Sequence, residues 1–131
     1  MGYCIDQRDA SFFISKDNLD SVLSAIHRLG HDYTNSHYYS WIDNDYTNYN
    51  DLKKVFNCWR WEICDDKEGN IIAIYFNGSK LGDDMVLFRA IAPYVKNDSY
   101  IEIMGEDGEF WRWVFKNGTC IEAVPEIIWK Y

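Results

Sequence analysis

The tripeptide Trp-Arg-Trp occurs twice in this chain, at residues 59–61 and at residues 111–113. A turn sequence follows each copy closely, so we expect each copy to lie in a β-strand. Side chains alternate between the two faces of a strand, so each copy would place two indoles on one face and an arginine on the other. Such a row of indoles is either the centre of a packed core or a flat aromatic surface that binds a ligand. The sequence leaves both readings open.

Three helices are predicted from apolar residues at helical spacing. The clearest begins after Ser15, whose hydroxyl can cap the amino end of the helix, and stops at Gly30. A shorter helix is expected at residues 50–57. In the third helix Asp83 serves as the cap, and Pro93 tightens or ends the last turn.

Strands are predicted from alternating or continuous apolar runs that are separated by turn sequences. They lie at residues 3–5, 11–14, 38–42, 59–64, 71–76, 100–104, 110–115 and 119–124. The run at 71–76 is apolar on both faces, which is typical of a central strand. The expected fold class is α+β, with an antiparallel or mixed sheet of about five to six strands and two or three helices packed mainly on one face. At 131 residues, the chain is expected to form a single domain over residues 1–131.

The last two strands are expected to form a hairpin, because Asn117-Gly118 is a two-residue turn signal. With this turn, Phe115 pairs with Cys120 and Trp113 pairs with Glu122. A carboxylate opposite an indole makes the tryptophan face mixed rather than purely apolar. The register therefore favours a semi-exposed aromatic site at the second Trp-Arg-Trp copy.

The second copy is thus the better candidate for a binding surface, and an acidic turn precedes it. Tryptophan and tyrosine give large contact areas at recognition surfaces, and they also stack on nucleobases. The candidate binding residues are Trp111, Arg112, Trp113, Glu106, Asp107, Glu109 and Glu122. The first copy faces the wholly apolar strand at 71–76 and is the better candidate for core.

The formal net charge is −8, from 21 acidic and 13 basic side chains. Binding to phosphates requires clustered lysine and arginine, so direct binding to a nucleic-acid backbone is not expected. An acidic surface fits a basic protein partner, or it serves solubility alone. No signal peptide, membrane-spanning run or disulfide spacing is visible, so we expect a cytoplasmic protein with reduced thiols. The sequence leaves the oligomeric state open.

No motif for catalysis, a cofactor or a metal stands out. His27 and His31 are four residues apart, but Gly30 separates them at the end of the predicted helix. The segment that starts at Asp43 begins like a calcium loop but lacks its glycine and its final glutamate. Acidic pairs occur in turns at 65–66, 83–84 and 106–107, where we expect exposure to solvent. The chain is therefore expected not to be an enzyme.

Several stretches carry a resemblance to known sequences. They are Gly78, Lys80-Leu81-Gly82-Asp83-Asp84 and Gly105-Glu106-Asp107-Gly108, followed by Trp111-Arg112-Trp113-Val114-Phe115. Together they resemble a family of small acidic proteins of bacteria and their phages that has no assigned activity. The resemblance implies a prokaryotic or phage accessory protein and carries over no catalytic residue.

These observations together predict a non-enzymatic binding protein of phage or mobile-element type. It would antagonise a host defence or nuclease protein through an acidic, aromatic surface. Two alternatives stay open. One is a sponge that binds a small nucleotide signal, and the other is an immunity protein against a toxin.

Overall fold

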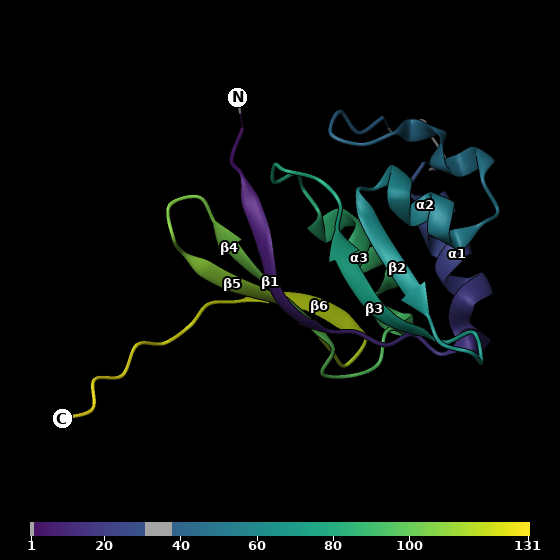
Figure 1. Ribbon diagram of the computed structural model, residues 1–131. Helices are drawn as coiled ribbons and strands as arrows, with labels where there is room; N and C mark the ends of the chain where they lie inside the picture. Colours follow the sequence, from purple (N-terminus) through teal and green to yellow (C-terminus); the bar gives the residue numbers. More distant parts are fainter. Residues whose placement is uncertain (1, 31–37) are drawn as a thin grey trace.

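The computed structural model describes residues 2–30 and 38–131, and it confirms the α+β class (Figure 1). Within these residues the helices are α1 (Leu19–Arg28), α2 (Leu52–Cys58) and α3 (Met85–Ile91). Short 3₁₀ helices lie at η1 (Lys16–Asn18), η2 (Asn44–Asn48) and η3 (Ala92–Tyr94). The strands are β1 (Ile5–Ser11), β2 (Trp61–Asp65), β3 (Ile71–Phe76), β4 (Tyr100–Gly105), β5 (Phe110–Lys116) and β6 (Thr119–Ala123).

The six strands divide between two antiparallel sheets rather than forming one. The larger sheet has the order β1-β4-β5-β6, and β2 and β3 form a separate hairpin. The two sheets meet along β1 and β3, where isolated antiparallel bridges join Cys4 to Lys80 and Ile14 to Ile71. The sheets are therefore connected at both ends of this seam and separated in its middle.

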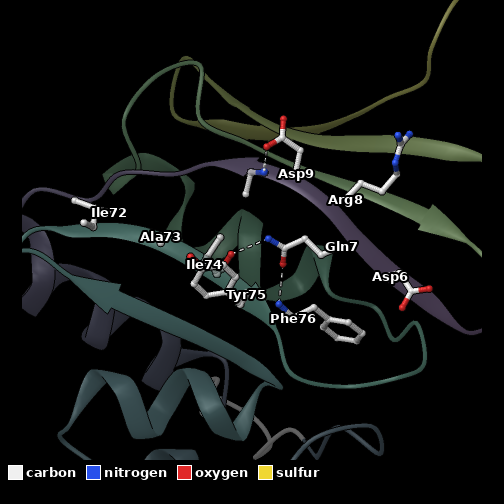
Figure 2. Close-up of a pocket in the computed structure, with 10 residues that line it drawn as sticks. Asp6, Gln7, Arg8, Asp9, Ile72, Ala73, Ile74, Tyr75 and Phe76 are labelled. Atoms are coloured by element: carbon white, nitrogen blue, oxygen red, sulfur yellow. Dashed lines mark hydrogen bonds between the residues drawn. The ribbon is translucent and has the colours of Figure 1, made fainter.

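The side chain of Gln7 spans the middle of the seam, as Figure 2 shows. Its Nε2 donates to the carbonyl of Ile74 at 2.8 Å, and its Oε1 accepts from the amide of Phe76 at 2.7 Å. Arg8 is an extra residue in β1, because the pairing with β4 shifts between Gln7 and Asp9. Such a bulge bends a strand, and an open cleft of about 590 Å³ lies between β1 and β3.

The core lies between the larger sheet, the β2–β3 hairpin and the helices. Every second residue of β4 and β5 points inward and is buried: Ile101, Ile103, Trp111, Trp113 and Phe115. Trp113 packs against Trp61 and Phe88, with ring centroids 6.0 and 5.1 Å apart. Helix α2 packs on β2 and α1 on α3, so the helices lie on the inner side of the larger sheet (Figure 1).

Several predicted elements are confirmed. The Ser15 hydroxyl accepts from the amide of Asp17 and caps η1, which leads into α1, and α1 ends before Gly30. In the β5–β6 hairpin, Phe115 pairs with Cys120 and Trp113 pairs with Glu122, as the turn sequence predicts.

Two predicted strands are wrong. The segment 11–14 is not a strand, because β1 ends at Ser11 and the chain then crosses to the second sheet, where Ile14 bridges β3. Residues 38–42 form a turn. The side chain of Asn44 closes it, because it bonds both the amide and the carbonyl of Tyr39, at 3.0 and 2.8 Å.

The first Trp-Arg-Trp copy is also not a strand. Trp59 ends α2, Arg60 has a φ of 71°, and only Trp61 belongs to β2. Both indoles are nevertheless fully buried, so the prediction that this copy belongs to the core is confirmed. The two copies share a sequence but have different backbone conformations, which argues against a duplicated structural unit.

Candidate functional site

An open groove lies at the end of the larger sheet, where the β4–β5 turn, the start of β5 and the segment after β6 meet. It has a volume of about 820 Å³. The residues that line it are mostly apolar: Tyr3, Leu81, Gly108, Glu109, Phe110, Trp111, Glu122, Val124, Pro125 and Ile127. Three of the predicted binding residues, Glu109, Trp111 and Glu122, are among them.

The acidic β4–β5 turn beside this groove is held by the start of the chain. Glu106 accepts from the amide of Cys4 through Oε1 at 2.8 Å, and its own amide donates to the Cys4 carbonyl at 3.0 Å. The hydroxyl of Tyr3 donates to the Glu109 carboxylate and accepts from the amide of Asp107 at 3.3 Å. The carboxylates of Glu106 and Glu109 are therefore fixed in position beside the groove.

Two glycines allow this close contact. Gly108 has a φ of +86°, which favours glycine in the turn. At Gly105, a Cβ atom would overlap the Glu109 carboxylate and the Tyr3 hydroxyl. These contacts explain both glycines of the sequence Gly-Glu-Asp-Gly. Together with Glu109, this sequence brings three carboxylates to one turn.

The two indoles of the second copy have different environments. Trp113 is 2% exposed and lies in the core against Phe88, while Trp111 is 9% exposed and forms part of the groove. Glu122, opposite Trp113, is exposed at the edge of the sheet. Both indoles are therefore buried, and the semi-exposed tryptophan face expected from the register is wrong. Trp111 still lines the groove, and the exposed ring beside it is that of Phe110.

Arg112 is not brought together with the other candidates, because it lies on the outer face of the sheet. Its Nε donates to Glu102 at 2.8 Å, and its guanidinium stacks on the Tyr100 ring, 4.1 Å from the centroid. On the same face Arg8 stacks on Phe110 at 4.2 Å. Arginine and aromatic side chains thus cover the outer face, and Phe110 belongs both to this face and to the lining of the groove.

Sequence reasoning missed the groove residues that come from distant parts of the chain. Tyr3 and Leu81 reach the groove because the amide of Leu81 donates to the Tyr3 carbonyl at 2.7 Å, which continues the bridge between Cys4 and Lys80. No local signal marks this contact. The apolar residues after β6 are visible in the sequence, and Val124 and Ile127 among them line the groove.

The sequence also led to a wrong prediction for Asp84, which is buried rather than exposed. The acidic pair 83–84 was expected to be exposed, with Asp83 as the helix cap, but α3 begins after Asp84, which is 1% exposed. Its carboxylate accepts from Arg60 Nη2 at 2.9 Å, from Trp61 Nε1 at 3.1 Å and from the Gly82 amide at 3.2 Å. These partners occupy both oxygens, so its role is structural.

Among the described residues, neither His27 nor the calcium-like segment forms part of a metal site. In the described part of the chain, no group of three or more histidine, cysteine, aspartate or glutamate residues could hold a metal ion. His27 Nε2 donates to the Tyr49 carbonyl at 2.8 Å. His31 and His37 lie outside the described residues. The segment that begins at Asp43 forms η2, with the Asp43 carboxylate as its cap.

The buried cysteines are not arranged as nucleophiles. Burial, with a smaller contribution from Asp43, raises the pKa of Cys58 to about 11. Burial also raises the pKa of Cys120 to about 12. Because the thiolate is the reactive form, both thiols are inert near neutral pH.

No protein-family model, characterised protein or solved structure matches this chain. The resemblance to small acidic phage and bacterial proteins therefore stays a prediction. Among the described residues, no helix is long and apolar enough to cross a membrane.

Proposed function

We propose that this protein is a non-enzymatic binding protein that engages a basic protein partner through the groove. The observation that carries the proposal is an apolar floor beside exposed carboxylates. The floor includes Phe110 and Trp111. Hydrogen bonds hold the carboxylates of Glu106 and Glu109, and those of Asp107 and Glu122 are exposed nearby. A partner that presents a large apolar side chain flanked by lysine or arginine would match both the apolar floor and the carboxylates.

The two parts of the site would contribute differently to binding. Exposed ion pairs each add little to affinity, about 0–1 kcal/mol. Carboxylates that are held in place raise the rate of encounter with a basic surface, and the net charge of −8 acts in the same direction. Most of the affinity would come from a hydrophobic side chain that packs on Phe110 and Trp111.

Within this proposal the partner is a host defence or nuclease protein, and the chain is an inhibitor of phage or mobile-element type. The acidic charge and the family resemblance support this role. A cytoplasmic location belongs to the same proposal, and the four free cysteines fit a reducing compartment. A toxin-immunity protein would use the same surface, with its toxin as the basic partner.

A small nucleotide ligand is the second candidate, and the outer face of the larger sheet favours it. Tyr100 and Phe110 present rings there, with Arg112 and Arg8 beside them. Bases stack on such side chains. However, Glu102 already pairs with both arginines, at 2.8 and 3.8 Å, so a phosphate would have to displace it. The groove therefore carries the leading proposal.

A displayed library of short random peptides tests the leading proposal. We expect selection of sequences that place lysine or arginine around a large apolar residue. Binding should weaken steeply as salt is raised, because exposed charges are screened. The triple substitution Glu106→Gln/Glu109→Gln/Glu122→Gln should reduce the affinity by about tenfold or more. Glutamine keeps the side-chain oxygens that accept hydrogen bonds in the turn.

The control is Asp20→Asn/Glu62→Gln/Glu68→Gln, which removes three exposed carboxylates elsewhere and gives the same net charge. It should bind the selected peptides nearly as well as the unchanged chain. Equal losses in both variants would show that only net charge matters and would reject the groove. Selection of acidic or charge-free peptides would reject the basic partner. A titration with cyclic and linear nucleotides, followed by tryptophan fluorescence, tests the second candidate.

A further inference from the structure

The segment after β6 is the most exposed apolar part of the described chain. Ile127, Ile128, Trp129 and Tyr131 are 79, 72, 84 and 116% exposed. Figure 1 shows residues 124–131 leaving the domain as an extended segment without a helix or strand. Contiguous apolar surface of this kind marks a contact site in a folded protein.

The same part of the molecule contains an open sheet edge. Phe115 bonds to Asp98 and Ser99 through its carbonyl and amide, on the β4 side of β5. Backbone groups alternate in direction along a strand, so its partner Cys120 does not bond to β5. The amides and carbonyls of Cys120 and Glu122 therefore point out of the sheet. An open edge of this kind is a template for another strand.

The facing edges of β1 and β3 are occupied, because these strands lie against each other across the seam that Gln7 spans. Apart from Lys130, residues 127–131 are β-branched or aromatic, and such residues favour strands. One continuous stretch, residues 119–131, thus supplies both an open edge and a strand-like segment to pair with it.

We propose that the chain forms a two-fold dimer in which residues 127–131 of each copy pair antiparallel with β6 of the other. The register that pairs all five residues of β6 places Pro125 on the two-fold axis. The missing N–H of Pro125 would point back toward β5 and not toward the second copy, so the pairing loses no hydrogen bond there.

This register matches apolar side chains on the outer face of the sheet. Ile121, which is 49% exposed, faces Trp129 of the second copy, and Ala123 faces its Ile127. Direct cross-strand pairs of this type stabilise a sheet. On the inner face, Glu122 is diagonal to Lys130 of the second copy. This pair opposes part of the repulsion between two chains of net charge −8.

The area is sufficient for a specific dimer. Two buried aromatic residues account for about 300–500 Å² on each exchanged segment. Two such segments, together with the isoleucines on them and on β6, reach about 1,200 Å² or more, where specific interfaces begin. A two-fold arrangement uses the same surface on both copies, and residues 119–131 are complementary to themselves in this way.

Sedimentation equilibrium of the full chain over a range of concentrations tests the dimer. We expect a monomer–dimer equilibrium whose dissociation constant rises by about thirtyfold or more in Trp129→Glu, since buried tryptophans dominate interfaces. Trp129 is exposed in the single chain, so this variant keeps its fold. Ile121→Glu should also weaken the dimer, while Ile72→Glu on β3 should not, although Ile72 is 48% exposed. A monomer at every concentration, or a dimer unchanged by Trp129→Glu, would overturn the proposal.

Disulfide trapping tests the register. In a Cys4→Ser background, Ala123→Cys/Ile127→Cys should give a covalent dimer under mild oxidation. Cross-strand partners of this kind have Cα atoms about 4.5 Å apart, which a disulfide can bridge. Within one extended chain these positions are about 13 Å apart. Ala123→Cys/Ile128→Cys is the control, because its thiols lie on opposite faces. Equal trapping in both variants would contradict the strand pairing.

Discussion

Arg60 Nη2 donates hydrogen bonds to both carboxylate oxygens of Asp84, at 2.9 Å to Oδ1 and 3.1 Å to Oδ2. Asp84 is only 1% exposed. Arg60 reaches it from a backbone with a φ of 71°, a conformation that costs a non-glycine residue free energy. The pair joins the start of β2 to the segment before α3. The strained backbone and the buried charges therefore belong to one structural unit.

Removing one partner of this pair should be severely destabilising. We expect Asp84→Ala to lower the free energy of unfolding by about 3–5 kcal/mol, because it leaves Arg60 largely buried without its carboxylate. Urea denaturation measures the difference. The neighbouring Asp83→Ala is the control, since Asp83 is exposed and its substitution should change stability by no more than about 0.5 kcal/mol. Similar losses at both positions would contradict the structural role of Asp84.

The Gln7 side chain should stabilise the seam between the two sheets. Gln7→Ala removes the acceptor for the Phe76 amide and the donor to the Ile74 carbonyl, and it should cost about 1–3 kcal/mol. Hydrogen exchange should show faster exchange of the Phe76 amide. Asp6→Ala, one residue earlier on the exposed side of β1, is the control. Unchanged exchange at Phe76 would mean that Gln7 does not hold the seam.

The two faces of β5 should respond differently to truncation. Trp113→Ala removes a buried indole that packs on Trp61 and Phe88, and we expect a loss of about 3–5 kcal/mol. Phe110→Ala, on the outer face of the same strand, should cost about 1 kcal/mol, mainly from the contact with Arg8. Thermal and urea unfolding compare the two. A larger effect at Phe110 would contradict the assignment of the inner face as core.

Alkaline pH should lower the free energy of unfolding, because the buried Cys120 thiol and Tyr46 hydroxyl have raised pKa values. Burial raises the pKa of Cys120 from 9.0 to about 12 and that of Tyr46 from 10.0 to about 12. Between about pH 9 and 12 the unfolded chain has lost protons that the folded chain keeps. Stability therefore falls as the pH rises through this window, and it is fully present below it.

Cys120→Ala isolates one of these groups. The stability difference between the unchanged chain and this variant should be largest below about pH 9. Above that it should shrink by about 1.4 kcal/mol per pH unit, because only the unchanged chain has the thiol to ionise on unfolding. Urea titrations at a series of pH values measure it. A difference that stays constant up to pH 12 would contradict the raised pKa of Cys120.

Short-range patterns predicted part of this molecule well. The Ser15 cap, helix α1 and the stop at Gly30 depend on neighbours within a few turns. The β5–β6 register follows from the two-residue turn at Asn117-Gly118. The acidic turn at Gly105-Glu106-Asp107-Gly108 was also predicted from its sequence. Each of these features depends on residues that are close in the sequence.

The sequence by itself determined the α+β class, the clearest helix, the last hairpin and the surplus of acidic charge. Only the tertiary structure decided which tryptophans are core, that Asp84 is buried, and that Tyr3 and Leu81 complete the groove. The two Trp-Arg-Trp copies show why the sequence alone does not determine burial. They have the same side chains but different backbones, because α2 and Asp84 hold one copy while β4 and β6 hold the other. In both copies, contacts with residues far apart in the chain determine the burial and the backbone conformation. A local sequence pattern carries no information about such contacts.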